Sequence, residues 1–66
     1  MINLDFFHDQ AMRALSASNA ARREYRRFPC VTNWLALQAA ARRSRIMESA
    51  YQTAVEASRQ LVERTA

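Results

Sequence analysis

The sequence predicts an all-α fold, an antiparallel hairpin of two long helices. Its 66 residues contain no Gly and one Pro, the two residue types that most often interrupt helices. Apolar and small residues recur at three- and four-residue steps on both sides of that proline, as they do on one buried face of a helix. The stretch from Thr32 to Ala66 contains neither helix breaker and is long enough for a helical rod of about 50 Å.

The first helix is predicted over residues 4–27. Asn3 or Asp5 is expected to cap its start, because their side-chain oxygens accept hydrogen bonds from free N–H groups there. Small residues fill the middle of its stripe, which lets a second helix approach closely, and bulky residues close both ends. The positions of the stripe are Leu4, Phe7, Ala11, Ala14, Ser18, Ala21, Tyr25 and Phe28.

A short turn is predicted over residues 28–31, because Pro29 disfavours helical geometry at Phe28, the residue before it. The second helix is expected over residues 32–64, with Thr32 as its N-cap. The alternative is a start at Pro29 as the first helical residue. So short a connection favours antiparallel neighbours, and residues 1–66 then form a single helical-hairpin domain.

The second helix carries two apolar sides. One is a heptad-spaced seam for the first helix, made of Leu37, Ala40, Ser44, Met47, Tyr51, Ala54, Ser58 and Leu61. The other lies beside it and consists of Leu35, Ala39, Ile46, Ala50 and Ala57. One helix covers only one side, so the second side is expected to meet another surface. The simplest candidate is a second copy, which gives a homodimer and an antiparallel four-helix bundle.

The length of the chain also favours a partner. A domain of this size buries only about 60% of the surface that its unfolded chain exposes, and small domains usually gain stability from disulfides, metals or association. Cys30 is the single cysteine and His8 the single histidine, so neither an internal disulfide nor a Cys/His metal site is expected. No cofactor is expected either.

Catalytic constellations are not expected. Asp5 and His8 stand three residues apart, which on a helix suggests a surface pair near its start. Cys30 would need a base and a pocket to act as a nucleophile, and a chain without Gly has no Gly-rich phosphate loop. A two-helix hairpin also offers little of the concavity of an active site. We therefore expect a protein that is not an enzyme.

No apolar run approaches the ~18 residues of a membrane span. The first ten residues, MINLDFFHDQ, carry acidic rather than basic side chains, unlike a secretory signal peptide. We expect a cytoplasmic protein without a membrane partner.

Arginines gather near the turn. Residues 13–45 carry eight Arg and one acidic residue, a local charge of +7, against −2 for residues 1–12 and −1 for residues 46–66. Three interpretations apply: a solvated face, a site for an acidic protein surface, or a site for nucleic-acid phosphates. Neither a helix-turn-helix signature nor interleaved aromatics support the third. The arginines singled out for partner contact are Arg22, Arg23, Arg26, Arg42 and Arg43.

The aromatic residues divide into two groups. Phe7, Tyr25, Phe28 and Tyr51 follow the helical seams and are expected in the core. Trp34 and Phe6 do not lie on these seams. Trp and Arg are typical anchors of protein interfaces. We therefore interpret Trp34 as a partner contact, with the alternative that it folds over the turn and caps the bundle end.

In size and pattern the chain resembles small helical-hairpin proteins that bind other proteins, such as secretion cochaperones and the host-directed inhibitors of bacteriophages. This resemblance is architectural. A short chain rich in Ala and Arg and without Lys, as a GC-rich genome tends to encode, fits a bacterial or phage source. The expected function is non-catalytic binding to a partner protein, as an inhibitor, adaptor or cochaperone that occludes the partner through a helical face. The alternative is a small basic regulator that binds nucleic acid through its arginines.

Overall fold

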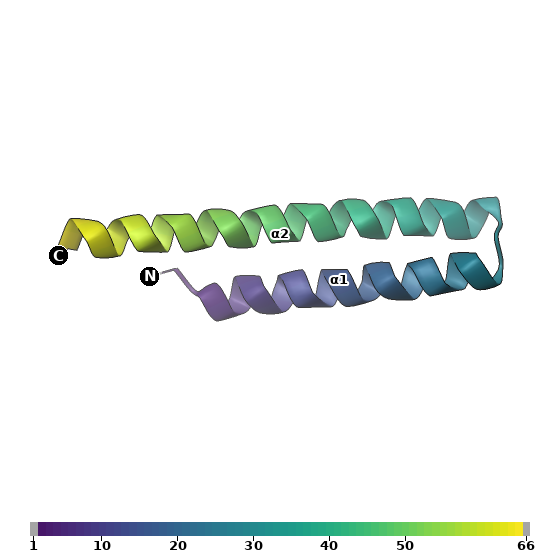
Figure 1. The fold of residues 1–66 in the computed structure, drawn as a ribbon, viewed down its shortest axis with the longest axis horizontal. Coiled ribbons are helices and arrows are strands. Elements are labelled where there is room, and N and C mark those ends of the chain that lie inside the picture. The colour runs from purple at the N-terminus through teal and green to yellow at the C-terminus, as the bar shows by residue number, and fades with distance from the viewer. Residues whose placement is uncertain (1, 66) are drawn as a thin grey trace.

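A computed structural model describes residues 2–65 and contains two α-helices, α1 (Leu4–Arg27) and α2 (Val31–Thr65), which pack antiparallel as a hairpin (Figure 1). Residues 2–65 form no β-strand. The Cα atoms extend over 54 × 14 × 13 Å, so the molecule is a narrow rod. The predicted fold class, an all-α helical hairpin, is confirmed.

The start of α1 is held by a side-chain cap. Asn3 has an extended backbone, with φ −91° and ψ 91°, and its Oδ1 accepts a hydrogen bond from the Phe6 N–H at 3.1 Å. This bond satisfies one of the N–H groups that a helix start leaves without an intrahelical acceptor. Of the two caps expected from the sequence, the structure uses Asn3, and Asp5 lies in the first turn.

The turn is fastened to the end of α1 by a side chain of α2. The Phe28 N–H still donates to the Glu24 carbonyl at 2.9 Å, as the last bond of the α1 ladder. The Asn33 side-chain amide then donates to the Phe28 carbonyl at 2.9 Å and to the Glu24 carbonyl at 3.5 Å. The Phe28 carbonyl, which the end of α1 leaves free, is thus satisfied from the opposite helix, and the Glu24 carbonyl accepts a second, longer bond.

α2 begins earlier than the sequence predicted. Its first helical residue is Val31, and the Trp34 N–H donates to the Cys30 carbonyl at 2.9 Å. Cys30 therefore occupies the cap position. The prediction of Thr32 as N-cap is wrong, because Thr32 is already inside the helix, and Pro29 lies before the helix rather than at its first position.

The interface between α1 and α2 is made of small residues in its middle. Ala14 and Ser18 of α1 and Ala54 of α2 are buried. None of the described side chains is completely shielded from solvent. Half-buried larger residues complete the interface, namely Leu4, Phe7, Tyr25, Leu37, Met47 and Tyr51. Small residues bring the two backbones close, but they leave a core with little volume.

The register of the hairpin follows from two pairs. The rings of His8 and Tyr51 are in contact across the helices, and Tyr25 and Trp34 line the same hollow near the turn. The residue numbers of each pair add up to 59, so residue n of α1 lies level with residue 59 − n of α2. The first residue of α1 is thus level with Val55, and the rest of α2 extends beyond α1 (Figure 1).

Two residues expected in the seams lie outside them. Phe28 ends α1 with φ −133° and ψ 86°, so its ring leaves the helical stripe. It is 56% exposed, with the Arg27 guanidinium 5.4 Å from its ring centre. Leu61 lies on the part of α2 that extends beyond α1 and is 52% exposed. The expectation that Phe28 belongs to the core is wrong, and Leu61 does not pack in the seam for α1.

Candidate functional site

The first candidate surface is a line of apolar residues along α2, called here the α2 stripe. It consists of Leu35, Ala39, Ile46, Ala50, Ala57 and Leu61. Leu35 and Ile46 are each 56% exposed, because helical periodicity turns them away from the seam that contacts α1. Ala50 and Ala57 are half-buried. The stripe is therefore an apolar surface on the outside of the hairpin.

An open hollow of about 500 Å³ lies against the centre of the α2 stripe. Ile2 and Phe7 form one wall of this hollow, from the lead-in and the first turn of α1. The opposite wall belongs to α2 and consists of Ile46, Ser49, Ala50, Thr53, Ala54 and Ala57. Sequence reasoning missed the contribution of Ile2 to this hollow, because Ile2 precedes the first helix and therefore belongs to no helical pattern.

The exposed area of the hairpin is large for its mass. A compact folded protein of 7.6 kDa exposes about 4,300 Å² by the usual scaling of surface with mass. This chain exposes 5424 Å², an excess of about 1,100 Å² over that scaling. The excess arises because a rod one helix pair thick buries only one side of each helix.

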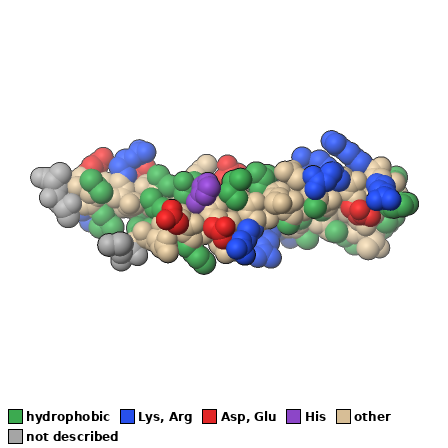
Figure 2. All heavy atoms as spheres, turned by 90° about the horizontal axis from the view of Figure 1, so that it is seen from below, with side chains coloured by type: hydrophobic (Ala, Val, Ile, Leu, Met, Phe, Trp, Pro, Cys, Tyr) green, Lys and Arg blue, Asp and Glu red, His purple; other side chains and the backbone are tan. Residues whose placement is uncertain are grey.

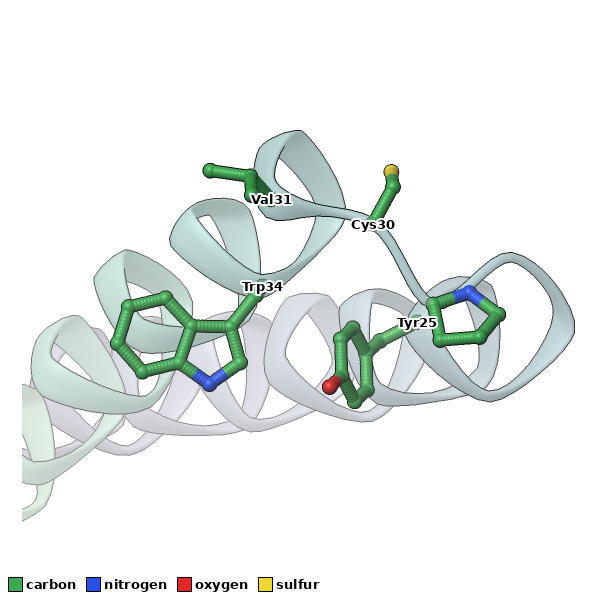
Figure 3. Close-up of a pocket in the computed structure, with 5 residues that line it drawn as sticks. Tyr25, Cys30, Val31 and Trp34 are labelled. Atoms are coloured by element: carbon green, nitrogen blue, oxygen red, sulfur yellow. The ribbon is translucent and has the colours of Figure 1, made fainter.

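The second candidate surface lies at the turn and is called here the loop-end surface. A hollow of about 300 Å³ is lined there by Tyr25, Pro29, Cys30, Val31 and Trp34 (Figure 3). The rings of Tyr25 and Trp34 lie on the same side of the hairpin, whereas the side chains of Val31 and Cys30 point toward the other side (Figure 3). Trp34 is 46% exposed, so much of the indole remains open to a partner.

The arginines singled out from the sequence, which are Arg22, Arg23, Arg26, Arg42 and Arg43, are all exposed. Figure 2 shows basic side chains near the turn and again farther along the rod. The register places Arg22 and Arg23 level with residues 36–37, and Arg42 and Arg43 level with residues 16–17. The centres of the two groups are therefore about 9 Å apart along the axis, so the two groups do not lie at the same level of the rod.

The ion pairs found within residues 2–65 involve other arginines. Arg13 pairs with Asp9 at 2.9 Å, and Arg59 pairs with Glu56 at 3.6 Å. Both pairs join neighbouring turns of one helix and are exposed, so each stabilises the fold by less than about 1 kcal/mol. The basic residues near the turn thus keep their charge available to a partner or to solvent.

His8 and Cys30, two of the groups considered for catalysis, lie far apart along the hairpin. His8 packs against Tyr51, and Cys30 is exposed at the turn. In the described part of the chain, no three His, Cys, Asp or Glu side chains are grouped as a metal site would require. Nor does either described helix combine the length and the apolarity needed to cross a membrane.

Comparisons with protein-family models, with curated proteins and with solved structures gave no match. The argument for function therefore rests on the two surfaces. The α2 stripe is long and mostly apolar, with the exposed Arg42 on the same helical face between Ala39 and Ile46. The loop-end surface combines an exposed indole with a concentration of arginines.

Proposed function

We propose that this protein is a non-catalytic protein-binding module that works as a dimer of hairpins. It would act as an inhibitor, adaptor or cochaperone by occluding a surface of its partner. The observation that carries the proposal is the excess of exposed surface, about 1,100 Å² above the scaling for compact proteins. Part of the exposed surface is apolar, since Leu35 and Ile46 are each 56% exposed, and exposed apolar patches mark sites of association.

The α2 stripe is the surface proposed for the second copy. Its exposed Leu35 and Ile46 are aliphatic, and interfaces between identical subunits are more apolar than transient ones. Burial of this stripe against a second hairpin gives the four-helix bundle expected from the sequence. The association also adds apolar burial to a core that is otherwise made of small residues.

The loop-end surface is proposed for the partner protein. Trp34 supplies a half-exposed aromatic anchor, and Arg22 and Arg26 supply bidentate hydrogen-bond donors for carboxylates. Trp and Arg are the residue types most enriched among the residues that dominate binding energy. The positive charge of residues 13–45 favours a partner with an acidic surface.

Nucleic-acid binding remains the alternative, favoured by the exposed arginines that no ion pair within residues 2–65 neutralises. The two functions differ in their dependence on salt. Binding to phosphates weakens steeply as salt rises, in proportion to the number of phosphates neutralised. An interface anchored on an indole depends less on salt.

The dimer is tested by sedimentation equilibrium of the wild type and of two variants. Ile46→Arg places a charge in the α2 stripe and is expected to give a monomer of 7.6 kDa. Gln38→Arg adds the same charge at an exposed position outside the stripe and is expected to leave the dimer intact. A wild type that is monomeric at high concentration would contradict the dimer.

Partner binding is tested by capture from a bacterial lysate on the immobilised protein, followed by affinity measurements on the purified partner. Trp34→Ala is expected to weaken binding at least tenfold, about 1.4 kcal/mol. Phe6→Ala is the matched control, because Phe6 is also an exposed aromatic and lies at the far end of α1. Equal losses for both variants, or binding only to DNA or RNA at low salt, would contradict the proposal.

A further inference from the structure

We infer that two copies of this chain associate antiparallel through α2, about a two-fold axis level with residue 48. The inference rests on the proposed dimer and specifies its geometry. It places residue n of one α2 level with residue 96 − n of the other. Three observations carry it: the spacing of the stripe, the shape of the hollow and the distribution of charge.

The spacing of the α2 stripe is the same read from either end. Its six members, at positions 35, 39, 46, 50, 57 and 61, are separated by four, seven, four, seven and four residues. The midpoint is residue 48. A two-fold interface brings the same patch of each subunit together. In antiparallel helices the apolar positions of the two copies can meet only if their spacing is the same in both chain directions. Leu35 then meets the partner's Leu61, and Ala39 meets the partner's Ala57.

The side chains at the centre are complementary in size. Ile46 is the large exposed residue there, and it falls level with the partner's Ala50. Beside Ala50 lies the open hollow of about 500 Å³ between α2 and Phe7. The sec-butyl side chain of Ile46 can enter that hollow on the partner. By symmetry, the partner's Ile46 enters the same hollow on the first copy. Each large residue thus faces small ones, which is how helices interdigitate.

Charge selects the antiparallel arrangement over the parallel one. Residues 13–45 carry +7, whereas residues 1–12 and 46–66 carry −2 and −1. A parallel dimer places the two strongly basic halves side by side. The antiparallel dimer places the acidic open end of each copy beside the basic half of the other. Complementary charge fixes the orientation of partners even where its contribution to affinity is modest.

The exposed area fits one such interface. A specific protein interface buries about 800 Å² on each partner. The hairpin exposes about 1,100 Å² more than a compact protein of its mass. One α2–α2 interface therefore brings the exposed area of each copy close to that of a compact protein of its mass. It also leaves the two loop-end surfaces free, at opposite ends of the dimer.

Site-specific cross-linking tests this geometry, and the single native cysteine supplies part of the test. In the antiparallel dimer the two Cys30 residues are about 54 Å apart along the axis, whereas a parallel dimer brings them level. The second part mixes two variants, Ala39→Cys and Ala57→Cys, each made in a Cys30→Ser background. A short bis-maleimide is added to the wild type, to each variant alone and to the mixture.

The expected result is a cross-linked dimer in the mixture, in several-fold excess over either variant alone, with no cross-linked dimer from Cys30. Cross-linking through Cys30, or equal yields for the mixture and the single variants, would overturn the antiparallel geometry while leaving the dimer in place. Sedimentation of the same samples separates this outcome from a monomer. A monomeric wild type would overturn the dimer and this inference with it.

Discussion

The imidazole ring of His8 lies edge-on against the phenol ring of Tyr51, with ring centres 5.5 Å apart and planes inclined at 69°. Edge-to-face rings at this distance attract each other. His8 belongs to the second turn of α1 and Tyr51 to the middle of α2, so their contact joins the helices far from the turn. Together with Tyr25 and Trp34, it sets the register of the hairpin.

The first prediction concerns this ring pair. Tyr51→Ala removes both the ring contact and a half-buried side chain, and is expected to lower the free energy of unfolding by about 2 kcal/mol. Tyr51→Phe keeps the ring and is expected to cost much less. Urea denaturation measures both at one fixed protein concentration, because the stability of the proposed dimer would depend on concentration. Equal losses for the two variants would contradict the role of the ring.

The second prediction concerns the buried small residues. Ser18→Leu adds a large side chain where the interface consists of small buried residues, and is expected to cost about 1–3 kcal/mol. Ala17→Leu adds a similar side chain one position away, where the residue is exposed, and is expected to be nearly neutral. Thermal denaturation followed by circular dichroism measures the difference. A neutral Ser18→Leu would contradict close packing at this point.

The third prediction concerns the turn. Asn33→Ala removes the hydrogen bonds from the Asn33 side chain to the carbonyls of Phe28 and Glu24 and is expected to cost about 1 kcal/mol. Thr32→Ala is the matched neighbour. It is expected to be nearly neutral, since Thr32 lies inside α2, whereas loss of an N-cap costs about 1 kcal/mol. The opposite order of the two losses in urea denaturation would restore Thr32 as the cap.

The fourth prediction concerns the start of α1. Asn3→Ala removes the hydrogen bond to the Phe6 N–H and is expected to cost about 1 kcal/mol. Asn19→Ala changes the same residue type at an exposed position in the middle of α1. It is expected to stabilise the helix by a few tenths of a kcal/mol, because Ala has the higher helix propensity. Chemical denaturation of both variants gives the comparison, and a loss for Asn19→Ala as large as for Asn3→Ala would contradict the cap.

The helices could be predicted because their information is local. Pro29 and the three- and four-residue spacing around it are visible in the sequence, and Ala14 and Ser18 stand out in that spacing as the small residues of the seam. The exposed position of the Phe28 ring was harder to predict. It continues the helical spacing, but the residue before a proline leaves helical geometry, and its ring leaves the seam with it.

Other features depend on how the two helices are placed in space. Which residues of the opposite helix lie beside each arginine depends on the geometry of the turn. This pairing changes when α2 begins at Val31 rather than at Thr32. Leu61 continues the spacing of the seam, yet α1 has no residue level with it. The spacing of Leu35 and Ile46 places them away from the seam for α1, and it supplies only the pattern that the proposed second copy would have to match.

The register also gives the hairpin an expected order of folding. Near the turn, Tyr25 and Trp34, nine residues later, line the same hollow, whereas the ring contact at the open end joins His8 to Tyr51, 43 residues later. Closing a short loop costs less conformational entropy than closing a long one. We therefore expect the helices to pair first at the turn and last at the open end, so that substitutions near Tyr25 slow folding and substitutions near His8 mainly speed unfolding.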